Sequence, residues 1–193
     1  MLELSWQREK DFELFYSQWA AFIYNVAYRM CGNHIETEEI VQDTFIRVFR
    51  FVDRFRGGSL KSWLYRIAMN LSYTYLQRNK VRHIHEISLD HDGGEEKEDL
   101  FKDNFIDNTA SPEQQIEKQE ITDTVQFALN LLPTEQKAVL ILSDVEGLSY
   151  KEISNIVDCP VGTVRSRLAR ARKLFREALK HSRVKRKINH VSD

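Results

Sequence analysis

The chain contains very little of what several large classes of protein need. Its two cysteines, Cys31 and Cys159, are too few to cross-link a disulfide-rich secreted domain among 193 residues. Seven glycines and three prolines cannot supply the many tight turns of a β-sandwich. No apolar run approaches the roughly 20 residues that cross a bilayer. We therefore expect neither a disulfide scaffold nor a β-sandwich, and no membrane insertion.

The pattern of a secretory leader is also missing. A signal peptide needs a basic stretch followed by an apolar one, but the chain opens MLELSWQREKDFELF, where acidic residues interrupt that pattern. Together with the low cysteine content, this start predicts a cytoplasmic protein.

Motifs that carry catalysis are absent as well. The sequence has no glycine-rich phosphate loop, no GxSxG and no HExxH, so we expect no enzyme, no catalytic residue and no cofactor. The weak candidates for a metal site are Cys31, His34, His83 and His85. A redox pair of Cys31 with Cys159 is a second weak candidate. Because Cys31 ends an apolar helical segment and Cys159 lies in a turn, we expect no bound metal.

What the chain does contain is charge, divided unevenly along its length. Its 28 basic and 29 acidic residues give a net charge of −1, but residues 1–80 carry +2, residues 81–118 carry −7 and residues 119–193 carry +4. The middle stretch has no sustained hydrophobic periodicity, so self-repulsion and low apolar content leave it little to bury. Residues 82–111 are therefore predicted to be an acidic, flexible linker between two small domains.

Hydrophobic residues recur at helical spacing throughout the first domain. One helix is predicted to end near Cys31, a second to span 35–51, and a third to follow the N-cap Ser59. The second helix is expected to turn these residues toward the core: Ile40, Val41, Phe45, Val48 and Phe49. Its outer face is expected to be acidic and to carry Glu36, Glu38, Glu39, Gln42 and Asp43. The first domain is thus predicted to be a helical bundle.

The second domain has a helix-turn-helix pattern. Ser111 and Pro112 are expected to open a helix that runs to about Leu131, and Thr134 to cap the next helix. A capping box at 149–152 opens a short helix, which halts at 158–160 before a longer helix begins. Helix, tight turn and longer helix are typical of DNA-binding proteins. The fold class predicted for the whole chain is all-α.

The last helix has an apolar face and a cationic face. At about 100° per residue, the inward residues are Val161, Val164, Leu168, Ala171 and Phe175. The opposite side carries Ser166, Ala169, Arg170 and Lys173, flanked by Arg165, Arg172 and Arg167. Residues 165–187 hold 11 basic residues and one acid, which predicts that Arg170 and Ser166 approach base edges in a major groove. The alternative is a solvated, arginine-rich surface helix.

The segment between the second and third helices has a different chemistry. It combines the cations Arg54, Arg56 and Lys61 with the aromatic residues Phe55 and Trp63 around a pair of glycines. Aromatic rings stack on exposed bases and cations follow phosphates, so this mixture favours single-stranded nucleic acid. The alternative is that the two rings only close the core of the bundle.

The most distinctive segments of the chain are EEIVQDTFIRVF, SWLYRIAMN and CPVGTVRSRLARAR. In their order and spacing they resemble the extracytoplasmic-function (ECF) sigma factors of the bacterial sigma-70 family. The resemblance implies region 2 at residues 1–81, region 4 at 112–182 and a basic tail at 183–193. It implies a subunit that directs promoter-specific transcription initiation by melting the −10 element and reading the −35 element. The resemblance implies three partners: core RNA polymerase, through its β′ clamp and β flap; promoter DNA; and an anti-sigma factor. The promoter DNA is expected to be duplex at the −35 element and single-stranded at the −10 element.

The resemblance also assigns roles to particular residues. The residues implied to bind the polymerase are Glu39, Gln42, Asp43 and Arg47. Those implied to bind the −10 element are Asp53, Arg54, Phe55, Arg56, Gly57, Ser59, Lys61, Trp63 and Asn70. Those implied to bind the −35 element are Thr163, Arg165, Ser166, Ala169, Arg170 and Lys173.

Two questions stay open at this level. The acidic linker either threads toward the path by which RNA leaves the polymerase, as family linkers imply, or is a solvated spacer. The rival to a sigma factor is a conventional helix-turn-helix regulator that binds duplex DNA as a dimer. Such a regulator needs neither an acidic docking helix nor an aromatic-basic loop in its first domain.

Overall fold

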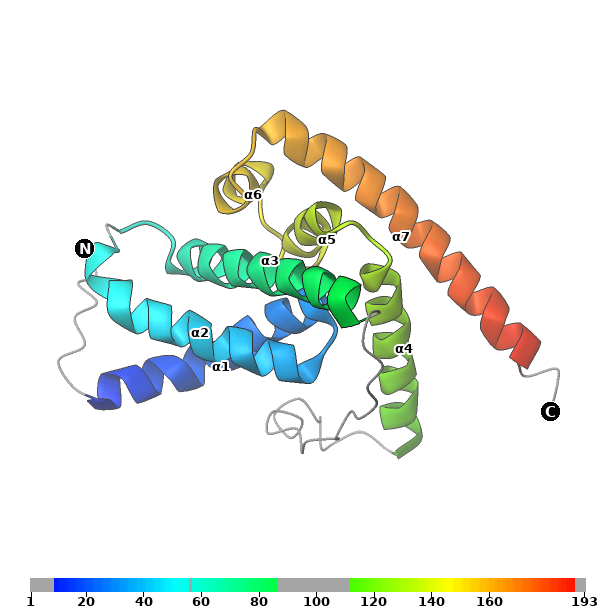
Figure 1. The fold of residues 1–193 in the computed structure, drawn as a ribbon, viewed down its shortest axis with the longest axis horizontal. Helices are drawn as coiled ribbons and strands as arrows, with labels where there is room; N and C mark the ends of the chain where they lie inside the picture. Colours follow the sequence, from blue (N-terminus) through cyan, green and yellow to red (C-terminus); the bar gives the residue numbers. More distant parts are fainter. Residues whose placement is uncertain (1–8, 56, 87–111, 190–193) are drawn as a thin grey trace. The chain divides into compact units, whose positions relative to one another are not determined.

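The computed structural model describes residues 9–55, 57–86 and 112–189, and within these residues all regular structure is helical. The chain divides into two compact units, Met1–Thr109 and Ala110–Asp193. The helices of each unit are drawn in Figure 1, and each unit is described by itself below.

The first unit is a bundle of three long helices, α1 (Glu9–Cys31), α2 (His34–Phe51) and α3 (Leu60–Glu86), with a 3₁₀ turn η1 (Val52–Arg54) after α2. The predicted helix ends are confirmed. Gly32 follows α1 with φ of 73°, a left-handed conformation that glycine adopts without strain. The Ser59 Oγ accepts a hydrogen bond from the backbone N–H of Ser62 at 3.2 Å, which caps α3.

The core of the first unit contains the apolar faces of all three helices. The predicted inward residues Ile40, Val41, Phe45 and Val48 are buried on α2. The prediction for Phe49 is wrong, because 55% of this residue is exposed. Phe49 lies one heptad after Gln42 and therefore on the outer side of α2, where its ring meets only the edge of the bundle, 5.4 Å from the ring centre of Phe12.

The second unit contains α4 (Pro112–Asn130), α5 (Thr134–Leu140), the π-helical segment η3 (Ile141–Val145), α6 (Tyr150–Ile156) and α7 (Val161–Asn189). Helix α4 begins at Pro112 as predicted, whereas the expected cap Ser111 lies outside the described residues. The prediction for Thr134 is wrong: it is the first residue of α5, and Pro133 occupies the N-cap position without a side-chain hydrogen bond. Proline has no side-chain acceptor, so the first N–H groups of α5 have no side-chain cap.

The helix-turn-helix is formed as predicted. Ser149 and Glu152 make both hydrogen bonds of a capping box at the start of α6. Asp158 turns the chain between α6 and α7 with φ of 50°, a conformation that aspartate tolerates better than most side chains. On α7, Val164, Leu168 and Ala171 are buried, and the outer two residues of the predicted apolar face, Val161 and Phe175, are half-buried.

Two helices extend beyond the predicted domain boundaries. Helix α3 continues through Glu86, so residues 82–86 at the predicted start of the linker are helical. Helix α7 continues through Asn189, into the predicted basic tail. The remainder of the predicted linker, residues 87–111, lies outside the described residues.

Candidate nucleic-acid and protein interfaces

The exposed side of α2 carries the residues that the sequence assigns to polymerase binding. Glu39, Gln42 and Arg47 are exposed, whereas Asp43 is half-buried. The Tyr75 hydroxyl of α3 donates a hydrogen bond to Oδ2 of Asp43 at 3.1 Å. Burial of the phenol, with Asp43 beside it, raises the pKa of Tyr75 to about 12. Asp43 therefore serves the packing of the bundle as well as its surface.

Helix α3 holds a second carboxylate of α2. The Asn79 side-chain amide donates a hydrogen bond to Oε1 of Glu36. Because α3 supplies a donor to both Glu36 and Asp43, the acidic side of α2 is oriented by the neighbouring helix and not by α2 alone.

The same side of α2 also exposes large apolar residues, which the sequence reading missed. Ile35 is 50% exposed, Ile46 is 47% exposed and Phe49 is 55% exposed. The signal that could have revealed them is their spacing: residues 35, 39, 42, 46 and 49 alternate steps of four and three, so they share one side of a helix. The outer face of α2, defined here by Ile35, Glu39, Gln42, Ile46 and Phe49, therefore mixes apolar and charged groups.

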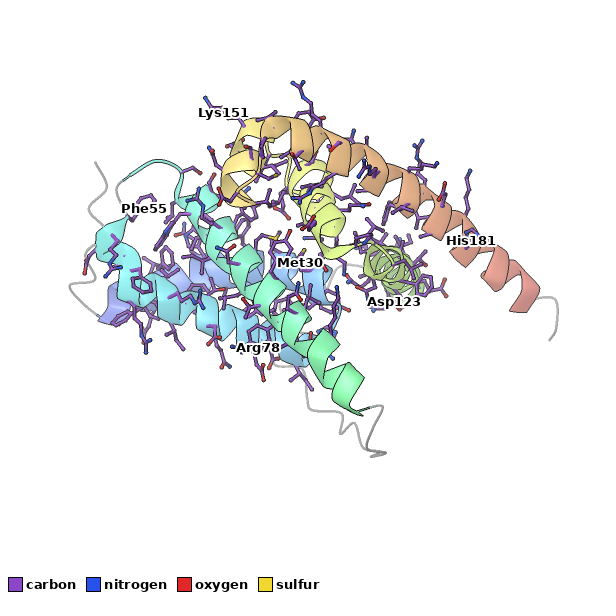
Figure 2. All side chains as sticks on the ribbon, turned by 45° about the horizontal axis from the view of Figure 1, so that its top comes forward. Met30, Phe55, Arg78, Asp123, Lys151 and His181 are labelled. Atoms are coloured by element: carbon purple, nitrogen blue, oxygen red, sulfur yellow. The ribbon has the colours of Figure 1, made fainter. Side chains whose placement is uncertain are left out.

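The segment between α2 and α3, together with the first turn of α3, combines aromatic rings with cations. Figure 2 labels Phe55, which lies in this segment. The ring centres of Phe55 and Trp63 lie 5.3 Å apart. Trp63 is partly buried against the core of the bundle, and Phe55 is half-buried on it. Trp63 thus contributes to the core, and Phe55 extends the aromatic surface outward from it.

Two cations of the same part of the chain lie against neighbouring aromatic rings. The Arg54 guanidinium lies 5.0 Å from the ring centre of Phe51, and the Lys61 ammonium lies 5.2 Å from that of Phe22. The residues of the predicted −10 set that are exposed to solvent are Asp53, Arg54, Gly57, Ser59 and Asn70. Arg56 lies outside the described residues.

Asn70 lies on α3, on the same side of the helix as Trp63. It follows Trp63 by seven residues, which places both on one side of the helix. The predicted −10 residues outside the loop therefore continue its surface along α3.

The outward side of α7 is as predicted from the sequence. Ser166, Ala169, Arg170 and Lys173 are exposed, and we call these four residues the reading face. Thr163 is half-buried in the first turn, where its carbonyl accepts a hydrogen bond from Ser166 Oγ at 3.0 Å.

Other basic groups surround the reading face. The exposed Arg165 places its guanidinium 5.9 Å from the ring centre of Tyr150 at the start of α6. Lys151, the neighbour of Tyr150, is also exposed and is labelled in Figure 2.

Two of the three arginines that flank the reading face, Arg172 and Arg167, are paired with carboxylates. Arg172 donates from Nε to Oδ2 of Asp144 at 2.9 Å and from Nη2 to Oδ1 at 2.7 Å. Arg167 lies 2.5 Å from Glu135 on the other flank. The hydrogen bond from Arg172 holds the pKa of Asp144 below its usual value.

The structure describes three of the residues that were weak candidates for metal binding or redox chemistry, Cys31, Cys159 and His34. Cys31 and Cys159 are half-buried, and neither is part of a disulfide. The His34 Nδ1 lies 2.5 Å from the Tyr24 hydroxyl, and the His34 ring stacks on Tyr28 with centres 4.5 Å apart. No group of three or more potential metal ligands occurs among the described residues. Nor does the described part of the chain contain a helix long and apolar enough to span a membrane.

Comparison with known proteins identifies both units. Residues 15–82 match the family model of sigma-70 region 2, and residues 122–175 match that of sigma-70 region 4. The chain is 34% identical to the RNA polymerase sigma-H factor of Pseudomonas aeruginosa over 89% of its own length and 87% of that protein. The ECF RNA polymerase sigma factor SigW of Bacillus subtilis is 33% identical over 82% of this chain and 83% of that protein. The chain belongs to the ECF sigma factor family. It is therefore a sigma factor that acts in transcription initiation, as the resemblance predicted.

Further relatives agree with this assignment. The ECF RNA polymerase sigma factor SigE of Mycolicibacterium smegmatis is 36% identical over 86% of this chain, which spans 60% of that relative's length. Among solved structures, the sigma factor RpoE of Bartonella quintana, in complex with the anti-sigma factor NepR, has a TM-score of 0.64 at 26% identity and covers 89% of this chain and 98% of its own. CnrH, in complex with the cytosolic domain of CnrY, shares the fold with a TM-score of 0.58 at 19% identity, over 91% of each chain.

Proposed function

We propose that this sigma factor docks on the β′ clamp of core RNA polymerase through the outer face of α2. Its aromatic-basic loop then captures an unpaired base of the −10 element, and the reading face of α7 contacts the duplex −35 element. The exposed Phe49 and Ile46, set among charged groups on α2, are the observation that carries the docking proposal. Apolar side chains surrounded by polar ones are typical of protein interfaces.

The docking surface on α2 includes both predicted and additional residues. Of the predicted set, Glu39, Gln42 and Arg47 are free to meet a partner directly. Asp43 contributes from a position that Tyr75 helps to hold. Burial of an apolar side chain stabilises an interface by roughly 1.5–3 kcal/mol, so Ile46 and Phe49 are expected to supply much of the affinity.

The −10 site is supported by the arrangement of the loop. The Phe55 ring lies beside the Trp63 ring at an angle of 45°, and Trp63 packs against the core, so the aromatic surface is held in place before any base arrives. A flipped base stacked on such a surface gains roughly 1–3 kcal/mol. Arg54, Lys61 and the exposed Asn70 lie where they can reach phosphates or a base edge beside it.

The −35 site is supported by exposure and charge. Arg170 and Ser166 are placed to meet base edges, and Arg165, Lys173 and Thr163 to meet the sugar-phosphate backbone. A bidentate arginine contact with guanine discriminates by roughly 1–3 kcal/mol against the wrong base.

We also propose the remaining parts of the assignment from family membership. The chain acts in the cytoplasm without catalytic activity of its own, and region 4 also meets the β flap of the polymerase. Because RpoE and CnrH were solved with NepR and with part of CnrY, an inhibitory protein partner is proposed for this chain too.

The docking proposal is tested by changing Phe49→Ser and Ile46→Ser, singly and together, in the full chain. The matched control is Leu14→Ser, because Leu14 is 71% exposed on α1 and lies outside the proposed surface. Each α2 variant is expected to weaken binding to purified core polymerase about tenfold, the effect of losing one buried apolar side chain. The control is expected to bind as the unchanged chain does, and circular dichroism confirms that all variants are folded.

The alternative function, that of a dimeric helix-turn-helix regulator, predicts the opposite results. A dimeric helix-turn-helix regulator binds duplex DNA without the polymerase and tolerates both α2 changes. Undiminished polymerase binding by the double variant would remove α2 as the docking surface, and failure of the unchanged chain to bind core polymerase would favour the regulator.

A further inference from the structure

The reading face of α7 is bordered on both sides by an arginine that a carboxylate already holds. We propose that Asp144 and Glu135 are specificity-determining residues that never touch DNA. They hold Arg172 and Arg167 away from the phosphates and leave the cations of the reading face, together with Arg165 and Lys151, available to DNA. The proposal rests on the proposed role of α7 as the −35 reader.

The placement of the two pairs follows from helix geometry. At about 100° per residue, the centre of the reading face lies roughly 110° from Arg172 in one direction and roughly 110° from Arg167 in the other. Both arginines are thus at the edges of the surface that would enter a major groove. A long, unpaired arginine at either edge could reach across to the sugar-phosphate backbone.

The partners come from the segments that precede the helix-turn-helix. Glu135 lies in the first turn of α5, and Asp144 lies in η3, the π-helical continuation of α5. A π-helical turn is wider than an α-helical one and re-aims the side chains that it carries. The two hydrogen bonds from Arg172 to Asp144 occupy both carboxylate oxygens and fix the guanidinium plane.

Stability alone is a poor explanation for these pairs. The Arg172 and Asp144 side chains are 48% and 34% exposed, and the Glu135 side chain is 62% exposed, whereas its partner Arg167 is 24% exposed. Exposed ion pairs of this kind add little to folding, because water and salt screen them. Because the pairs lie beside a DNA-binding surface, they also affect DNA binding. The carboxylate offsets the positive charge of the arginine that it holds, so that arginine attracts a phosphate less strongly.

That consequence is selective. Phosphate contacts supply nearly all of the affinity for unrelated DNA, whereas base contacts supply discrimination. Arg170 and Lys173 have no carboxylate partner within the described part of the chain and keep their full charge for the promoter. Neutralising the flanks while leaving the reading face charged lowers binding to unrelated DNA more than binding to the −35 element.

The test uses the full chain and two duplexes. One is the sequence that the unchanged chain enriches from a pool of short randomised duplexes, and the other is a shuffled version of it. Fluorescence anisotropy gives the dissociation constant of each duplex over a range of salt concentrations. The variants are Asp144→Asn and Glu135→Gln, with Asp123→Asn as the control, because Asp123 lies on α4, accepts a hydrogen bond from Gln119 and gives the same change in net charge.

Each variant is expected to bind the shuffled duplex more tightly and with a steeper salt dependence. One additional phosphate contact adds roughly 0.9 to the slope of log K against log salt, so the gain is about threefold larger at about 50 mM than at about 200 mM salt. The ratio of specific to shuffled binding falls accordingly, while Asp123→Asn matches the unchanged chain. Asp144→Glu, which keeps the charge, is expected to restore the ratio.

Arg172→Gln separates this role from a purely structural one. Alone it is expected to leave the salt slope unchanged, and combined with Asp144→Asn it is expected to return the slope to that of the unchanged chain. A reduced slope for Arg172→Gln alone, or an equal gain for Asp123→Asn, would overturn the proposal. If the unchanged chain enriches no duplex, the −35 proposal fails, and the salt slope on an arbitrary duplex from the pool still decides whether Arg172 and Arg167 are withheld.

Discussion

At the scale of single residues, several groups on this sigma factor serve the fold and the surface together. Asp43 belongs to the α2 surface proposed to meet the polymerase, yet its carboxylate accepts the Tyr75 hydroxyl. Changing Asp43→Arg would therefore disturb the bundle as well as any interface. Phe49 and Ile46 are cleaner probes because much of each side chain is exposed.

The Tyr75–Asp43 hydrogen bond predicts a pH dependence of stability. The pKa of Tyr75 is raised from 10.0 to about 12, chiefly by burial, so between these values the unfolded tyrosine ionises while the folded one stays protonated. The folded state then binds more protons, and the free energy of unfolding falls as the pH rises above 10. Urea unfolding at several pH values should show a smaller fall for Tyr75→Phe.

The same variant has an effect at neutral pH. Loss of the hydroxyl removes one partner of a half-buried carboxylate and should lower the free energy of unfolding by about 1 kcal/mol. Equal stability of the two proteins at neutral pH would mean that water replaces the hydroxyl without cost.

At the scale of secondary-structure elements, the ends of helices decide where the functional surfaces lie. The capping box of Ser149 and Glu152 begins α6 at a defined residue, and Asp158 turns the chain before α7. A shift of either end by one residue would rotate the following helix by about 100° and move the reading face away from DNA.

Replacing Ser149→Ala tests the value of this helix start. The side chain accepts from the Glu152 N–H at 3.3 Å, and its loss should lower the free energy of unfolding of the second unit by about 1 kcal/mol. Thermal unfolding followed by circular dichroism measures the change. Thr134→Ala provides the contrast, because Thr134 caps no helix and its replacement is expected to have little effect.

At the scale of the whole molecule, the energetics of promoter opening imply division of the work with the polymerase. Opening about ten base pairs at roughly 1.4 kcal/mol per step costs on the order of 14 kcal/mol. One or two stacked bases return only roughly 1–3 kcal/mol each. The chain by itself therefore cannot keep a promoter open.

This difference predicts weak binding by the free chain and strong, salt-sensitive binding by the holoenzyme. Permanganate footprinting should detect unpaired thymines at the −10 element only when core polymerase is present. Opening of the promoter by the sigma factor alone would contradict the proposed division of work. Run-off transcription over a randomised promoter pool would report both DNA elements in the same experiment.

The sequence by itself determined the all-α class, the helix-turn-helix and the reading face of α7, because periodicity and capping act between residues close together in the chain. Only the tertiary structure decided what meets across helices. Contacts such as Tyr75 with Asp43, Trp63 with Phe55 and Asp144 with Arg172 join residues 8 to 32 positions apart. The exposure of Phe49 is of the first kind, because its spacing from Gln42 and Ile46 already places it on the outer side of α2. Contacts between residues distant in the chain form only when the helices pack against one another, so spacing within one helix cannot identify them.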